Sequence, residues 1–280
     1  MLQDIPVFFA PAMVAESEGF SPSAAKPAAV VDSWRGLGIP ISIHAPPPVS
    51  MDELARAHDR VHVEEILAGR RRNGFGNTSL AVASSLPFTS GAMLAAAREA
   101  IRNGAVAVAP CSGFHHAGYG QVEGFCTFNG LMVAALALHA AGEANRVGIL
   151  DFDQHYGNGT DDIIERLNID WIVHHTEGRE YRQPKDAAPF LARIASIVEG
   201  MRGCDVILYQ AGADPHVNDP LGGWLTTAQL FERDRRTFEA ARRIGIPIAW
   251  NLAGGYQTPL RKVLDIHDNT MRACGDCFLT

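Results

Sequence analysis

The chain is short of cysteine, of positive charge and of long apolar runs, and each shortage excludes a class of protein. Its 280 residues include five cysteines, an odd number, and three of them lie in or beside apolar segments. Reduced intracellular thiols are usually placed in this way, so we expect a cytoplasmic protein rather than a disulfide-stabilised secreted one. The 24 Lys and Arg residues against 31 Asp and Glu residues give a net charge of −7, which argues against binding to nucleic acid.

Neither an export signal nor a membrane span is expected. The apolar stretch 5–15 contains two prolines and follows Asp4, and no Lys or Arg precedes Lys26, so it is unlike a signal peptide. The apolar helical run 131–141 is too short to cross a bilayer and contains His139.

Short apolar runs alternate with longer helical patterns along the chain. Strands are predicted at 7–9, 39–44, 105–109, 146–152, 171–174, 205–210 and 246–252. Helices are predicted at 24–35, 51–68, 90–103, 129–144, 159–167, 187–202, 226–243 and 259–271. This alternation predicts an α/β fold with a mostly parallel sheet flanked by helices, and we expect one domain over residues 1–280.

Polar residues gather where predicted strands end. The segments 110–121, 151–159, 212–219 and 254–257 each follow a strand. Ligands of such folds bind at the carboxyl ends of the strands, so we expect these four loops to share one site. The Gly- and Ser-rich segment 70–86 is predicted to be a mobile loop near the entrance.

One pair of residues in these loops has the chemistry of a metal site. Asp153 and His155 are two residues apart, so on an extended strand end both side chains would point to the same face. A carboxylate with an imidazole suits Zn²⁺ or Fe²⁺, and Asp214, in a tight turn after another strand, is the candidate third ligand. Helix capping or turn formation explains each residue alone, but it does not explain the set together with the adjacent imidazoles of His115 and His116.

Four motifs occur in a defined order along the chain. They are His115-His116-Ala117 followed by Gly124-Phe125-Cys126, the run from Ile149 to Thr160, Gly212-Ala213-Asp214, and Gly254-Gly255-Tyr256. From about Met51 onward, the chain thereby resembles the histone deacetylase family, which includes bacterial deacetylases acting on acetylpolyamines. The resemblance implies the three-layer arginase/deacetylase-like α/β fold, with a mostly parallel central sheet.

The resemblance also implies a role for each matching residue. Asp153, His155 and Asp214 would hold one Zn²⁺, and a structural K⁺ could lie near Asp151. The residues matching the catalytic groups are His116 as general base, His115 as its partner, Asp151 and Asn158 orienting the two rings, and Tyr256 stabilising the oxyanion. Phe125 would form one wall of the substrate channel, with Gly124 and Gly255 beside the substrate.

Several positions depart from the family pattern. Phe114 replaces the Gly that usually precedes the two histidines, and we expect it to narrow the cavity under the metal. Val173 lacks the hydroxyl expected of one K⁺ ligand, and Tyr181 is the candidate for the second channel wall. Lys26 could occupy the cationic position near an internal acetate exit, but a solvated lysine at a helix start is the preferred interpretation. Two cysteines of the C-terminal segment, Cys274 and Cys277, are interpreted as incidental.

The predicted function is a zinc-dependent deacetylase that hydrolyses an acetyl-lysine-like or acetylpolyamine-like substrate to acetate and a free amine. One alternative is an arginase-like dimanganese ureohydrolase, for which His216 could supply part of a second metal site. Another is a family member that binds an acylated ligand without turnover. An acetylated amine is the expected partner, and a homo-oligomer is compatible with the sequence.

Overall fold

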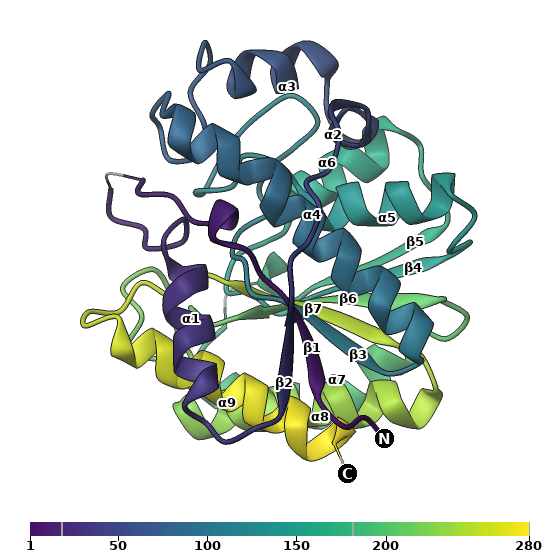
Figure 1. Ribbon diagram of the computed structural model, residues 1–280. Coiled ribbons are helices and arrows are strands. Elements are labelled where there is room, and N and C mark those ends of the chain that lie inside the picture. The colour runs from purple at the N-terminus through teal and green to yellow at the C-terminus, as the bar shows by residue number, and fades with distance from the viewer. Residues whose placement is uncertain (18, 181, 280) are drawn as a thin grey trace.

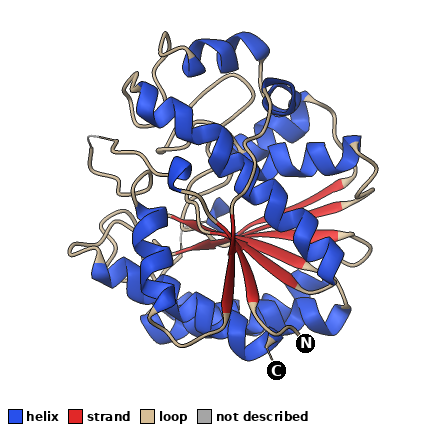
Figure 2. Ribbon diagram, viewed as in Figure 1, coloured by secondary structure: helices blue, strands red, loops and turns tan. Residues whose placement is uncertain are grey.

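Seven parallel strands form one sheet through the middle of the molecule (Figures 1 and 2). The structure is a computed structural model that describes residues 1–17, 19–180 and 182–279. In sheet order the strands are β2 (Ile41–His44), β1 (Ile5–Phe8), β3 (Val106–Ala109), β7 (Ile248–Ala253), β6 (Val206–Gly212), β4 (Val147–Asp151) and β5 (Ile172–Thr176). Each paired neighbour runs parallel. The predicted α/β fold is confirmed, and each strand boundary lies within two residues of its prediction.

Helices cover both faces of the sheet (Figure 1). One layer contains α1 (Lys26–Arg35), α7 (Ala187–Glu199), α8 (Thr227–Ile244) and α9 (Arg261–Phe278). The other contains α2 (Met51–Ala57), α3 (Arg60–Leu67), α4 (Leu80–Asn103), α5 (Gly130–Ala140) and α6 (Asn158–Arg166). Short 3-10 helices lie at Pro11–Met13, Glu177–Arg179 and Pro184–Asp186. Successive side chains of a strand face opposite layers: in β3, Val106 and Val108 pack into the first core, and Ala107 and Ala109 into the second.

The prediction of one continuous helix over 51–68 is wrong, because the helix is interrupted at His58. The backbone of His58 is extended, with φ −131° and ψ 155°. The ring is buried, and its Nδ1 lies 2.8 Å from the carbonyl oxygen of Gly118. Its Nε2 accepts the Asn129 N–H at 2.9 Å. These contacts separate α2 from α3, and they hold the loop that follows β3 against the start of α5.

The prediction of a mobile loop at 70–86 is also wrong for its second half, which belongs to α4. Ser79 caps this helix by accepting the Val82 N–H, and Pro87 lies inside it. The first half is tethered, since Gly74 N donates to Thr127 Oγ1 at 2.9 Å. By length and composition α4 could cross a membrane, but 56% of its most apolar window is buried inside the fold, as in a core helix.

At the C-terminus, α9 extends seven residues beyond its predicted end at 271. Cys274 and Cys277 both lie on it, buried and as free thiols, which is consistent with the interpretation that their spacing is incidental.

Candidate active site

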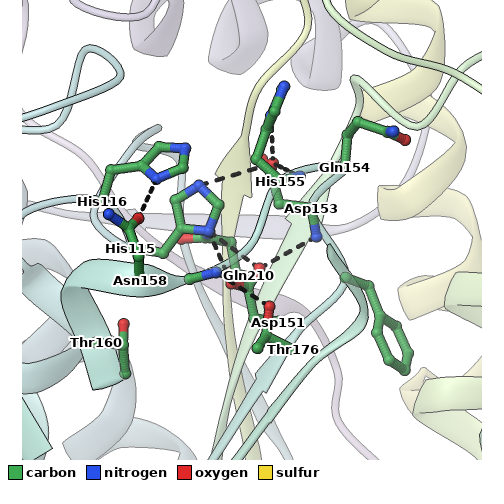
Figure 3. Close-up of polar contacts among 12 residues, drawn as sticks. His115, His116, Asp151, Asp153, Gln154, His155, Asn158, Thr160, Thr176 and Gln210 are labelled. Atoms are coloured by element: carbon green, nitrogen blue, oxygen red, sulfur yellow. Dashed lines mark hydrogen bonds and ion pairs between the residues drawn. The ribbon is translucent and has the colours of Figure 1, made fainter. Parts of the chain in front are cut away.

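Three potential metal ligands converge between the ends of β4 and β6. One ligand atom from each of Asp153, His155 and Asp214 lies within 4.8 Å of the others. His155 Nδ1 is 3.1 Å from Asp153 Oδ1 and 3.0 Å from Asp214 Oδ2 (Figure 3 shows the first two residues). We expected Asp153 and His155 on an extended strand end. Because β4 ends at Asp151, they lie instead in the loop that follows the strand. The turn of this loop nevertheless brings both side chains to one point.

The electrostatics of this cluster favour a bound cation. Asp214 is fully buried, and its Oδ2 has no hydrogen bond in favourable geometry although His155 is close. Burial, followed by the charge of Asp153, raises the pKa of Asp214. Contacts with Asp153 and Asp214 raise the pKa of His155 to about 11. Two buried carboxylates that converge on one imidazole form a donor set that a divalent ion would neutralise.

The surroundings also prepare His155 to bind through Nδ1. Its Nε2 lies 3.0 Å from the carbonyl oxygen of Leu221, which can only accept a hydrogen bond, so Nε2 carries the proton of the neutral ring. Gly254 makes room for the third ligand, because a Cβ at this position would lie 2.2 Å from Asp214 Cγ. The residues of the cluster therefore fit a metal ion such as Zn²⁺.

The first of the two adjacent histidines is deeply buried and is backed by a carboxylate. His115 Nδ1 lies 2.7 Å from Asp151 Oδ2, and His115 Nε2 lies 3.7 Å from Asp153 Oδ1 (Figure 3). Burial opposes protonation of His115, but the charges of Asp151 and Asp153 outweigh it and raise its pKa to about 9. Asp151 is held in turn by Gln210, whose Nε2 donates to its Oδ1 at 3.2 Å.

The second histidine is backed by an amide. His116 Nδ1 lies 2.6 Å from Asn158 Oδ1 (Figure 3), and the rings of His116 and His115 are 4.0 Å apart between centroids. Burial and the neighbouring charge of His115 lower the pKa of His116. The two rings therefore differ in basicity, in the sense that an acid/base pair needs.

A narrow cavity opens over these groups. It is lined by Ser23, Gly113, His115, His116, Gly124, Phe125, Cys126, Asp153, His155, Gly254 and Tyr256. The Phe125 and Tyr256 rings are 5.5 Å apart, and Phe20 stacks on Tyr256 at 5.7 Å. Phe20 escaped sequence analysis because nothing in its local sequence links it to a residue so far along the chain. Tyr181, the predicted second wall, lies outside the described residues.

Gly124 and Gly254 border this cavity, whereas Gly255 does not. A Cβ at Gly124 would lie 2.4 Å from His116 Cδ2, so the glycine allows the backbone to lie against the imidazole. A Cβ at Gly255 would instead meet Val263 Cγ1 at 2.6 Å. Gly255 thus allows the turn to pack on α9, and of these two glycines it is Gly254 that borders the cavity.

Phe114 does not line the cavity over the metal ligands. It adopts a φ of +90°, and its ring packs so closely on Gly130 that a Cβ there would lie 2.5 Å from Phe114 Cε1. The ring helps to line a second cavity, which shares Ser23, Gly113, Phe125 and Cys126 with the first. The expected narrowing therefore falls in this neighbouring cavity.

Lys26 is buried, which corrects the interpretation of a solvated lysine. Its side chain is fully inaccessible, and Nζ donates to the carbonyl oxygen of Gly254. Burial lowers its pKa to about 8, although the charges of Asp214 and Asp153 oppose the shift. A positive group thus lies behind the three candidate metal ligands.

Two further polar residues support the site. Thr176 pairs with Asp151 across β5 and β4, and its hydroxyl accepts the Gly157 N–H at 3.1 Å. Asp219 was missed by sequence analysis: its Oδ2 accepts the Tyr256 N–H at 2.8 Å and its Oδ1 accepts the Leu221 N–H at 3.0 Å. It therefore connects the Tyr256 loop to the segment that orients His155.

His216 is not placed to complete a second metal site. Its Nε2 lies 3.0 Å from Thr227 Oγ1, and its Nδ1 accepts the Asn218 N–H at 3.1 Å. Among the described residues, the cluster of Asp153, His155 and Asp214 is the single group with metal-binding geometry. This arrangement disfavours the two-metal alternative.

Comparison with known proteins identifies the family to which this site belongs. The histone deacetylase domain model matches residues 23–187 and 187–271. The chain belongs to the histone deacetylase domain family. Membership makes it a hydrolase of the deacetylase and amidohydrolase type.

Relatives and a solved structure agree with this assignment. A probable deacetylase of Methanothermobacter thermautotrophicus is 26% identical over 75% of this chain and 73% of its own. Acetylpolyamine amidohydrolase 2 of Pseudomonas aeruginosa is 44% identical over 51% of this chain and 48% of its own. The crystal structure of the HDA15 HD domain matches with a TM-score of 0.81 and 20% identity, covering 100% of this chain and 91% of that one. This last likeness shows the deacetylase-like fold.

Proposed function

We propose that this protein is a zinc-dependent deacetylase that hydrolyses a linear acetylamide to acetate and a free amine. The observation that supports it best is the shared cavity: two histidines of opposite pKa shift, two of the metal ligands and Tyr256 all line it. A bound Zn²⁺ would polarise an acetyl carbonyl and make its water more acidic. Asp153, His155 and Asp214 are the residues that would hold it.

His116 is the group best suited to take a proton from the attacking water. Its pKa is lowered, so the ring is neutral near pH 7 and can accept a proton. His115, whose pKa is raised by its carboxylate neighbours, supplies positive charge beside it. Protonated His116 can then return the proton to the departing amine.

Tyr256 is suited to stabilise the oxyanion. Burial raises the pKa of its hydroxyl above the usual range, so the group remains a hydrogen-bond donor. Asp219 fixes the Tyr256 backbone, and the rings of Phe20 and Phe125 confine its side chain from two sides. One such donor is typically worth about 10²–10³ in rate.

The walls of the cavity suggest the shape of the substrate. Aromatic rings beside a narrow opening suit an unbranched alkyl chain, as in an acetylated lysine side chain or an acetylpolyamine. A structural K⁺ near Asp151 and Thr176 is part of the proposal, since the hydroxyl of Thr176 and the carboxylate of Asp151 are oxygen ligands.

The test is acetate release from an acetyl-lysine reporter and from an acetylpolyamine by zinc-loaded protein. Wild-type protein should release acetate, and Tyr256→Phe should reduce kcat by about 10²–10³ because the donor is lost. Tyr119→Phe is the matched control, since Tyr119 lies on Arg166 outside the cavity. Tight binding of both substrates without acetate release would instead favour an acyl-binding protein, and a fully active Tyr256→Phe would remove the oxyanion role.

A further inference from the structure

A carboxylate lies at the outer end of the His116–Asn158 pair. Asn158 Oδ1 is 2.6 Å from His116 Nδ1, and Asn158 Nδ2 donates to Glu123 Oε2 at 2.8 Å. Glu123 is exposed and begins the turn that carries Gly124 and Phe125. Two backbone hydrogen bonds between Glu123 and Cys126, of 3.2 and 2.8 Å, fix that turn. The same turn therefore places Gly124 against the imidazole and Glu123 against the amide.

An asparagine cannot by itself decide which tautomer of a histidine it stabilises. With its oxygen toward Nδ1, it favours a proton on Nδ1 and leaves Nε2 free to accept one. Rotated by half a turn, it presents its NH₂ group to Nδ1, which favours a proton on Nε2. That second tautomer has no lone pair on Nε2 and cannot act as the base there.

The contrast with His115 shows why a third residue matters here. His115 is backed by Asp151, and a carboxylate only accepts hydrogen bonds, so no rotation of Asp151 changes the preferred tautomer. The tautomer of His116 is not fixed in this way, because its partner is an amide. Glu123 can fix the orientation of that amide, since a carboxylate can face the NH₂ group of Asn158 but repels its oxygen.

We propose that Glu123 is a positioning residue that fixes the orientation of Asn158 and thereby keeps the proton of neutral His116 on Nδ1. The inference rests on the proposed function, in which His116 accepts a proton through Nε2. Glu123 does not touch the substrate in this account. It acts through Asn158 and, through it, on the imidazole.

The kinetic test compares single and double variants of Glu123 and Asn158. Glu123→Ala should lower kcat about three- to tenfold with a small change in KM, as expected for one hydrogen bond that selects between two orientations. Glu123→Gln should be less impaired, because its amide oxygen can still accept from Asn158. Glu64→Ala, at an exposed glutamate of α3, is the matched control.

The sharpest prediction is a reversal of sign in the Asn158→Asp background. An aspartate at 158 accepts from His116 in either orientation, but it faces a second carboxylate at Glu123. Removing Glu123 should therefore raise the kcat of Asn158→Asp, although it lowers the kcat of wild-type protein. A loss in both backgrounds would overturn the proposal, as would a rise in KM confined to cationic substrates, which would make Glu123 a substrate-binding residue.

A direct readout does not depend on deacetylase activity. Nitrogen chemical shifts of labelled histidine, with the His116 signal assigned from His116→Gln, report which ring nitrogen carries the proton above the pKa. Wild-type protein should show the Nδ1–H form, and Glu123→Ala should show a mixture with the Nε2–H form. An unchanged Nδ1–H signal in Glu123→Ala would overturn the proposal even if the protein hydrolyses acetylamides. A shifted signal would support it even if no substrate turns over.

Discussion

The layer behind the cavity and the rim around it are built from different kinds of residue. Behind the cavity, the ionisable side chains of Lys26, Asp151 and Asp214 are fully buried, and Asp214 is itself a proposed metal ligand. At the rim, Phe20 is 60% exposed, and Glu123 is open to solvent. The buried groups interact strongly because little water screens them, whereas the rim groups contribute through single contacts that water can replace.

This difference implies a division of labour. A change in the buried layer alters several charges at once and should affect stability, metal binding and chemistry together. A change at the rim should affect one step, either the orientation of a group or the binding of the substrate chain. The following two variants test whether the two regions separate in this way.

The larger effect is expected at Lys26, in the pH dependence of stability. The folded pKa of about 8 is below the ordinary lysine value of 10.5, so the unfolded chain binds more protons between these values. Its contribution is therefore fully present above pH 10.5 and is lost as the pH falls through 8. The free energy of unfolding of metal-free protein should rise by up to about 3 kcal/mol across this window through Lys26.

Chemical denaturation at several pH values measures this contribution as a difference between variants. Lys26→Met should lack the rise that wild-type protein shows, while Lys262→Met, at an exposed lysine of α9, should retain it. Parallel curves for wild-type protein and Lys26→Met would mean that the burial of Lys26 does not control its protonation.

The smaller effect is expected at Phe20. Loss of an aromatic contact worth about 0.5–1.5 kcal/mol should raise KM roughly two- to tenfold in Phe20→Ala, because in this proposal the ring extends the aromatic wall for the substrate chain. The kcat should change little, since Asp219 and Phe125 still hold Tyr256 in place. Val61→Ala, at an exposed position of α3, is the control. Equal losses in kcat and in kcat/KM would place Phe20 in the chemistry and blur the distinction between rim and buried layer.

Much of the fold could be predicted from the sequence, because parallel strands buried on both faces leave clear apolar runs. The helix boundaries were less accessible where distant contacts decide them. Nothing near His58 reveals that its ring will bind the carbonyl of Gly118 and the N–H of Asn129. Likewise, the Gly- and Ser-rich segment 70–86 is typical of a loop, yet its second half is the start of α4, whose later turns are buried in the core.

The contacts of the candidate site show the same difference between sequence neighbours and distant residues. Asp153 and His155 are neighbours in sequence, so their pairing could be predicted, whereas the burial of Lys26 depends on Gly254, 228 residues away. The stacking of Phe20 on Tyr256 and the hydrogen bond from the Tyr256 N–H to Asp219 also join distant segments. Local motifs and the family resemblance predicted the candidate site residues, and long-range packing determines which side chains and backbone groups contact them.

The most direct test of the account is a zinc titration of metal-free protein with acetate release as the readout. The cluster of Asp153, His155 and Asp214 predicts that activity is absent without metal, rises with added Zn²⁺ and levels at one equivalent per chain. A requirement for two equivalents, for Mn²⁺ in place of Zn²⁺, or full acetate release by metal-free protein would contradict it.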